Sequence, residues 1–436
     1  MRQPLFARGI TLLVNNAVGQ GLAFLISIVI ARRLGAPSFG EYAAVMALIF
    51  VLGIAAEVGL EASLTREIAQ EPFRGRELLV ASLRAKAIVA GALAVLLGAT
   101  PVAVLLAPDP RSVDAVRLGG VLLVLNVVNS SFSAVFRAWG RMHYVLAINL
   151  AGLTIQLAGV IVLLLRTRSV AALIGWLAAV QVGELVGGVA LFRRGERTIG
   201  GASPAPTAWP ARLRDGNRGA MALLRRSLPL ALAGVLGAFR LRLDLFLVEA
   251  LRGSAEVGVF SVGTRLQAVL ALAPSSFFAA LFPAFSATAA PEAVADGEIG
   301  SRLYRCSLRA MAVAGCVAAV TGLVLAGPLV GLTFGSAYAG AAPVLRLLAL
   351  AVIPFLLNST VSLRLYAGRG QSLANRLAAF GLAIRATLGW LLVARWGASG
   401  AALTELVAEG AVLLVSWHRG VMNGGFAPHD RRARAR

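Results

Sequence analysis

The sequence is poor in the residues that build disulfide-bonded or metal-dependent domains. Its 436 residues include two cysteines and three histidines, and only 14% of the residues are charged. Cys306 and Cys316 lie in one apolar segment, about 15 Å apart along a helix axis, which is too far for a disulfide. The histidines show no metal-ligand spacing, and no nucleophile motif occurs. The sequence therefore predicts no disulfide, no metal site, no cofactor and no catalytic residue.

Acidic residues are also scarce, because 20 of them face 41 basic residues and leave a formal net charge of +21. Only one of the basic residues is a lysine. In a soluble protein this surplus would suggest nucleic acid as a partner. However, no basic stripe is interleaved with the aromatic residues that stack on bases. We therefore expect no nucleic-acid partner.

What the sequence has in abundance is apolar residues. They make up 58% of the chain, and the mean hydropathy is +0.81. This composition is too apolar for a soluble domain and predicts an all-α polytopic membrane protein. Apolar runs of about 20 residues, the length that crosses a bilayer, occur about twelve times. Their approximate limits are 11–31, 39–60, 83–106, 116–136, 143–165, 170–192, 227–250, 256–282, 303–327, 343–363, 371–394 and 399–417.

The basic residues predict the orientation of these spans. If the N-terminus is cytoplasmic, 28 of the basic residues fall on the cytoplasmic side, eight fall outside and five lie within spans. Because arginine and lysine accumulate in cytoplasmic loops, this distribution places both termini in the cytoplasm. The first apolar run follows a basic start without a small-residue cleavage site, so we expect a retained span rather than a signal peptide.

A single long polar stretch divides the chain. Residues 193–226 contain eight arginines and several prolines, which is typical of a cytoplasmic connector. It separates an N-terminal six-helix lobe, 1–192, from a C-terminal six-helix lobe, 227–417, and a basic cytoplasmic tail follows at 418–436. Six spans per lobe give the lobes the same orientation, as in parallel repeats. We expect two six-helix lobes around a central cavity.

The two lobes also begin alike. A shift of 218 positions places Gly253 on Gly35 and Gly258 on Gly40, each after an apolar run. Each lobe is therefore predicted to open with a helix and a turn marked by glycine.

Polar side chains within the spans are the candidates for function. In the fourth span, Asn126, Asn129 and Ser130 share one helical face, and Gln20 belongs to a weaker polar stripe in the first span. Such a face either lines a cavity or makes hydrogen bonds between helices, and the sequence leaves both open.

Charged residues in the spans indicate a functional site more strongly than polar ones do, because a charge facing lipid costs about 2.5–3.5 kcal/mol. Arg240 and Asp244 in the seventh span are four positions apart and can pair along the helix, whereas Arg242 points elsewhere. Arg265 lies at a similar depth in the next span, and Arg385 lies in the middle of the eleventh. Because guanidinium binds phosphate bidentately, these arginines are candidates for an anionic headgroup.

The acidic residues in the spans have two interpretations. Glu184, Glu405 and Glu409 either pair with arginines of neighbouring helices or form a relay for a proton or cation. Glu57, near the inner end of its span, is close enough to the interface to reach it.

Four segments carry a resemblance to a known family. With them, the chain resembles the polysaccharide (O-antigen type) flippases of the multidrug/oligosaccharidyl-lipid/polysaccharide exporter superfamily. The segments are ARRLGAPSFGEYA at 31–43, EVGLEASLTREIA at 57–69, FGSAYAGAAPVLRLLALAVIPFLLN at 334–358 and ARWGASGAALTELVAEGAVLL at 394–414. Two departures stand out: the proline of the family's PxYGxxGAA pattern is absent from the fourth segment, and lipid II flippases usually have fourteen spans.

The resemblance implies a MATE-like fold in the bacterial cytoplasmic (inner) membrane. It also implies alternating-access transport of undecaprenyl-diphosphate-linked oligosaccharide for lipopolysaccharide and other surface polysaccharides. Membrane lipids, a polysaccharide polymerase, glycosyltransferases and a coupling cation, H+ or Na+, would be its partners. On this basis Arg66 and Asp244 take the places of charged residues common in the family.

Two alternatives compete with a flippase. One is a cation-coupled multidrug-type exporter of the same superfamily, which would favour acidic rather than basic pockets. The other is a membrane glycan polymerase or glycosyltransferase, which would need a long outer loop with catalytic carboxylates. The predicted outer loops are mostly shorter than that requires.

Overall fold

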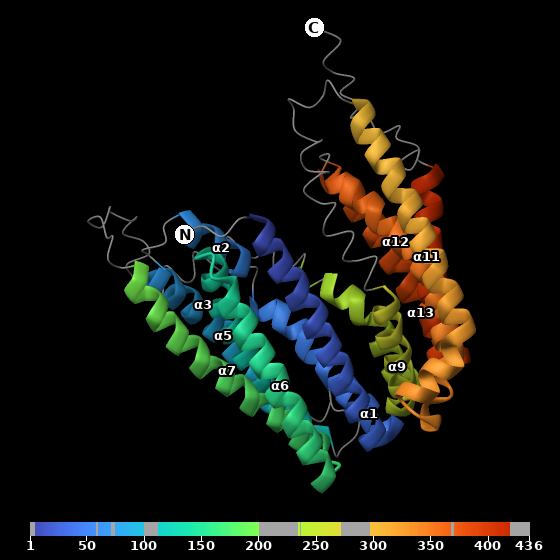
Figure 1. The fold of residues 1–436 in the computed structure, drawn as a ribbon. Coiled ribbons are helices and arrows are strands. Elements are labelled where there is room, and N and C mark those ends of the chain that lie inside the picture. The colour runs from blue at the N-terminus through green and yellow to red at the C-terminus, as the bar shows by residue number, and fades with distance from the viewer. Residues whose placement is uncertain are drawn as a thin grey trace. The chain divides into compact units, whose positions relative to one another are not determined.

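The computed structural model describes residues 5–57, 60–70, 75–99, 112–199, 234–235, 237–271, 297–367 and 370–418. Throughout these ranges the secondary structure is helical, without a strand (Figure 1). The helices are α1 (Leu5–Glu57), α2 (Leu60–Gln70), α3 (Gly75–Gly98), α5 (Val113–Ala138), α6 (Met142–Arg166), α7 (Val170–Ile199), an unlabelled helix over 237–252, α9 (Ser254–Leu270), α11 (Gly297–Thr333), the short 3-10 helix η6 (Ser336–Tyr338), α12 (Ala341–Ala367) and α13 (Gln371–His418).

Each predicted span overlaps one of these helices. In the described ranges, eight helices are long and apolar enough to cross a membrane. Two of them, Val18–Glu57 with 40 residues and Ser372–His418 with 47, are twice the length that one crossing needs, and each contains two predicted spans. The predicted spans 227–250 and 256–282 correspond to the helix over 237–252 and to α9, and their remaining residues lie outside the described part. The chain is a multi-pass, all-helical membrane protein.

Glycines in the left-handed region of the backbone separate consecutive spans. Gly35 within α1 has φ 78° and ψ 171°, and Gly253 before α9 has φ 82° and ψ 176°. Gly397 within α13 also has a positive φ, 57°. A side chain would clash with the backbone at such angles, so only glycine adopts them readily. The predicted glycine turns at Gly35 and Gly253 are confirmed, and their backbone angles agree to within a few degrees.

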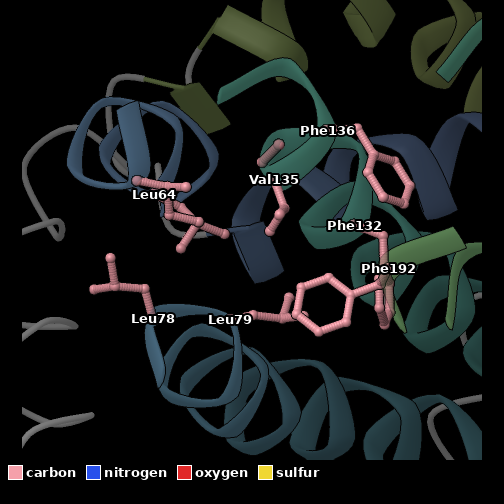
Figure 2. Close-up of a cluster of buried hydrophobic side chains, with 9 residues drawn as sticks. Leu64, Leu78, Leu79, Phe132, Val135, Phe136 and Phe192 are labelled. Carbon is pink, nitrogen blue, oxygen red and sulfur yellow. The ribbon is translucent and has the colours of Figure 1, made fainter. Parts of the chain in front are cut away.

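A short amphipathic helix, α2, was not recognised in the sequence. Its apolar side packs against α3 and α5 and completes a buried cluster, which Figure 2 shows in close-up. The cluster consists of Leu64 and Ile68 of α2, Leu78 and Leu79 of α3, Phe132, Ala134, Val135 and Phe136 of α5, and Phe192 of α7. It ties together the ends of four helices.

The chain forms two compact units, Met1–Arg242 and Leu243–Arg436. The boundary between them falls within the helix over 237–252. Helix α7 continues to Ile199, beyond the predicted lobe end at 192, because the helical pattern does not stop at Arg193. Most of the predicted connector, from residue 200 onward, and the tail beyond His418 lie outside the described residues. The division into lobes, connector and tail stays a prediction.

Candidate functional site

The second unit contains a buried arginine held by two carboxylates. Arg385, in the first half of α13, donates from Nη1 to Asp244 Oδ2 at 2.5 Å and from Nη2 to Glu409 Oε1 at 3.0 Å. All three side chains are nearly inaccessible, with exposed fractions of 8–9%. Asp244 comes from the helix over 237–252 and Glu409 from the second half of α13. The planar guanidinium therefore links three helical segments through charge-assisted hydrogen bonds.

Amide side chains extend this network to two more helices. Asn358 of α12 donates from Nδ2 to Glu409 Oε2 at 2.8 Å and to its carbonyl oxygen at 2.9 Å. Gln267 of α9 donates from Nε2 to Glu405 Oε1 at 3.0 Å. The buried oxygens Asp244 Oδ1 and Asn358 Oδ1 accept no hydrogen bond from the part of the chain that is described. The network around Arg385 thus combines two carboxylates and one guanidinium, with acceptor capacity left over, and Glu405 lies one helical turn before Glu409 on α13.

The structure gives Asp244 a partner that the sequence did not. The i,i+4 spacing predicts pairing with Arg240, which stays a prediction, and the structure adds Arg385, 141 positions away in the chain, as a partner of Asp244. Glu409 accepts from Arg385 of the first half of α13, which is one of the two interpretations that the sequence left open for it.

The first unit buries the chain's only lysine. Lys86 of α3 has an exposed fraction of 0%. Its Nζ donates to Ser130 Oγ at 2.8 Å and to the Val127 carbonyl oxygen at 3.4 Å, both on α5. The nearest recorded carboxylate is that of Glu57, at the end of α1, with Oε1 at 3.8 Å from Nζ. Lys86 lies at the beginning of the predicted span 83–106, but the orientation count included it among the 28 cytoplasmic basic residues. Its being the only lysine beside forty arginines was a signal that could have singled it out.

Glu57 connects this lysine to a cavity of about 250 Å³. The cavity is lined by Met46, Ile49, Phe50, Gly53, Ile54, Glu57, Leu123, Asn126 and Val127. The exposed Asn126 faces it, as one interpretation of the polar face of α5 predicted. Asn129 instead donates to Gln181 Oε1 of α7 at 2.5 Å, and Ser130 accepts from Lys86. That face therefore lines a cavity at one residue and bonds between helices at two.

A second ion pair lies at the same end of the unit. Arg137, at the end of α5, pairs with Glu61 of α2. Together with Lys86 and Glu57 it gives two cations and two carboxylates on four helices. Arg66 of α2 is exposed.

The remaining predicted residues lie elsewhere. Arg240 and Arg265 are half-buried, on the helix over 237–252 and on α9, and Gln20 is exposed on α1. The Arg242 guanidinium lies over the ring of Phe50, 4.8 Å from its centroid and within the first unit. Glu184 lines a largely apolar cavity of about 350 Å³ between α6 and α7.

Comparison with solved structures finds membrane transporters and a flippase of similar fold. The chain has a TM-score of 0.71 to the lipid II flippase MurJ in an inward closed conformation, with 13% identity over 93% of this chain and 86% of that one. A multidrug resistance MATE family transporter of the MOP superfamily, inward-facing, gives 0.69, with 14% identity over 93% and 94%. The Vibrio cholerae MATE transporter VcmN in its bent form gives 0.59, with 15% identity over 96% of each chain. No curated protein sequence matches the chain.

These likenesses establish the fold, a MATE-like helical membrane fold shared with transporters and a flippase rather than with enzymes. The sequence profile described as polysaccharide biosynthesis protein matches residues 5–289, about two thirds of the chain. The chain therefore belongs to the polysaccharide biosynthesis protein family.

Proposed function

We propose that the chain is a flippase for undecaprenyl-diphosphate-linked oligosaccharide, which it carries across the bacterial cytoplasmic membrane by alternating access. The product would serve surface polysaccharides such as the O-antigen of lipopolysaccharide. The observation that carries this proposal is the family match over residues 5–289. The fold shared with a lipid II flippase supports it.

The arginines within the spans suit such a cargo. A diphosphate headgroup is an oxyanion, and guanidinium groups remain charged and bind oxyanions bidentately. Arg240 and Arg265 are half-buried rather than enclosed, so we assign to them the contact with the headgroup. Arg385 is enclosed by two carboxylates, and we assign to it the positioning of Asp244 and Glu409.

A cation-coupled exporter is the second candidate, and the network in the second unit favours it. Two carboxylates there hold one guanidinium, and Asp244 Oδ1 accepts no hydrogen bond from the described residues. Such a site can take up a proton, whereas no group of three acidic, histidine or cysteine side chains in the described ranges is arranged to hold a metal ion such as Na+. In a flippase the same site would supply the coupling ion, so the identity of the cargo separates the two functions.

Transport by the purified full chain in liposomes tests the proposal. An undecaprenyl-diphosphate oligosaccharide with a nitrobenzoxadiazole label on the sugar is placed in both leaflets, and dithionite is added outside. If the protein flips the lipid, dithionite should reduce nearly all of the label. In protein-free liposomes, about half of the label should escape reduction, because it lies in the inner leaflet. Arg240→Ala and Arg265→Ala should slow the reaction, and Arg166→Gln, at an exposed position outside the predicted spans, should not.

Two results would reject the flippase. If the fraction of label that escapes reduction by dithionite were the same with the protein as in protein-free liposomes, the chain would not flip the lipid-linked oligosaccharide. If the same liposomes moved an organic cation such as ethidium against a pH or Na+ gradient, the exporter would take its place.

The proposed orientation has its own test. The native cysteines, Cys306 and Cys316, are both exposed and must first be replaced by serine. In intact cells, a membrane-impermeant maleimide should then label Ala255→Cys, which is an exposed position, but not Gly216→Cys in the connector. Labelling of Gly216→Cys without permeabilisation would reverse the topology.

A further inference from the structure

A hollow of about 400 Å³ in the first unit combines a basic rim with an apolar floor. It lies between the beginning of α3 and the end of α7, with α5 behind it. Its lining is Arg76, Leu79 and Val80 of α3, Phe132 of α5, and Val189, Phe192, Arg193 and Glu196 of α7. None of these residues belongs to the transport machinery assigned above.

Aromatic packing holds the two rims at a fixed spacing. The Trp139 ring stacks on Phe192, with centroids 5.3 Å apart, and Phe132 meets Phe192 edge-on at 6.1 Å. Glycines at 75 and 195 make room for the indole, since an added Cβ would lie 2.9 Å and 2.6 Å from its atoms. Leu79, Phe132 and Phe192 line the hollow, and Figure 2 shows all three within the buried cluster. The hollow is therefore a built feature of the packing rather than a gap between mobile side chains.

The position of the hollow along the helices matches the level of lipid headgroups. Arg76 is the second residue of the candidate span Gly75–Gly98, and Glu196 is the last residue of the candidate span Val170–Glu196. Both spans thus reach the same membrane surface here. Val80, one helical turn after Arg76 in α3, is 39% exposed and presents an apolar side chain next to the basic rim.

The charges select the chemistry of an occupant. Arg76 Nε lies 4.0 Å from Glu196 Oε1, a loose pair with exposed fractions of 76% and 39%. Arg193 is exposed, so two guanidinium groups and one carboxylate leave a surplus of one positive charge. A lipid with one net negative charge would balance this surplus, and a zwitterionic lipid would not. Basic pockets at the ends of transmembrane helices bind anionic headgroups in this way.

We infer that this hollow binds one anionic glycerophospholipid of the surrounding membrane. Arg76 and Arg193 bind the phosphodiester, and the acyl chains lie over Val80 and Val189. The lipid adds a polar link between the end of α7 and the beginning of α3, beside the aromatic packing and the loose Arg76–Glu196 pair. The occupant is a resident lipid and not the transported one.

The test measures the dissociation constant of phosphatidylglycerol for the full chain in neutral detergent, by native mass spectrometry. The variant Arg76→Gln/Arg193→Gln should bind it roughly 25-fold more weakly, because each arginine near an anionic group contributes about fivefold. The matched control, Arg166→Gln/Arg168→Gln, removes two exposed arginines elsewhere in the unit and should bind it as the unaltered chain does. Glu196→Gln should strengthen binding by about fivefold, because it removes the competing carboxylate.

Several outcomes would overturn the inference. Equal weakening in both double variants would mean general attraction by positive charge. Equally tight binding of phosphatidylethanolamine, or weaker binding by Glu196→Gln, would contradict the charge argument. Displacement of phosphatidylglycerol by inorganic pyrophosphate, at concentrations where sulfate has no effect, would identify a diphosphate site instead. Thermal unfolding of each variant without lipid confirms that the comparison is made between folded proteins.

Discussion

Among the described residues each unit buries one cation within its spans, and the two cations are held in different ways. In the second unit, Arg385 lies between two carboxylates, each within hydrogen-bonding distance and almost fully buried. In the first, Lys86 donates to a hydroxyl and a carbonyl, and its carboxylate partner, Glu57, is 3.8 Å away and 25% exposed. One cation is fixed by opposite charges, and the other mainly by neutral oxygens.

The difference follows from the chemistry of the two side chains. A guanidinium is a rigid planar fork that bridges two acceptors in set directions, whereas an ammonium is a compact charge on a flexible stem. Arg385 can therefore lock three helical segments together. Lys86 can follow small movements of α5 and of Glu57, whose carboxylate opens onto a cavity. We expect the second-unit network to stabilise the fold and the first-unit pair to tolerate change.

Removing Arg385 should give the largest effect. Arg385→Met keeps much of the side-chain volume but leaves Asp244 and Glu409 buried without their cation. Breaking a buried ion pair from one side costs about 3–5 kcal/mol, so the free energy of unfolding should fall by that amount. Chemical unfolding of the purified protein in detergent, and its quantity in the membrane, measure the loss.

The matched control for Arg385 neutralises the whole cluster. Arg385→Met with Asp244→Asn and Glu409→Gln leaves no uncompensated charge, so it should recover most of the lost stability. If this triple variant were as unstable as Arg385→Met alone, the loss would come from packing rather than charge, and the comparison with Lys86 would fail.

Removing Lys86 should have a smaller effect. Lys86→Met leaves Ser130 without its donor, but Glu57 is exposed enough to be hydrated from the cavity. The expected loss is about 1–3 kcal/mol, the cost of an unsatisfied buried polar group. It is measured in the same unfolding experiment. A loss equal to that of Arg385→Met would show that the two cations are held equally firmly.

Local sequence patterns predicted much of this fold and little of these contacts. The spans depend on apolar runs, and the turns at Gly35 and Gly253 depend on glycine, so short stretches of sequence were enough to predict both. The partner of Asp244 could not, because Arg385 lies 141 positions away in the chain and the nearer Arg240 satisfied the helical spacing.

Lys86 and α2 were missed for related reasons. Lys86 is the fourth residue of the predicted span 83–106 and follows several arginines, so the orientation count grouped it with the cytoplasmic basic residues. Its depth in the helix became evident only because α3 begins at Gly75. Helix α2 has only 11 residues, too few for a span, and its apolar positions, such as Leu64 and Ile68, gain meaning only when they meet α3 and α5.

The smallest expected effect comes from the acid beside Lys86. Glu57→Gln leaves the ammonium hydrogen-bonded to Ser130, and the lost carboxylate was both partly exposed and 3.8 Å away. Pairs of this kind contribute about 0–1 kcal/mol, so the free energy of unfolding should change by no more than that.

Glu409→Gln is the counterpart in the second unit. It should lower the free energy of unfolding by more than Glu57→Gln does, because it removes one of the two carboxylates that hold Arg385. The ratio of the two losses, from unfolding of both variants in one detergent, measures how differently the units hold their cations. Equal losses would contradict the comparison, and a larger loss for Glu57→Gln would reverse it, making the cavity-facing carboxylate the main support of Lys86.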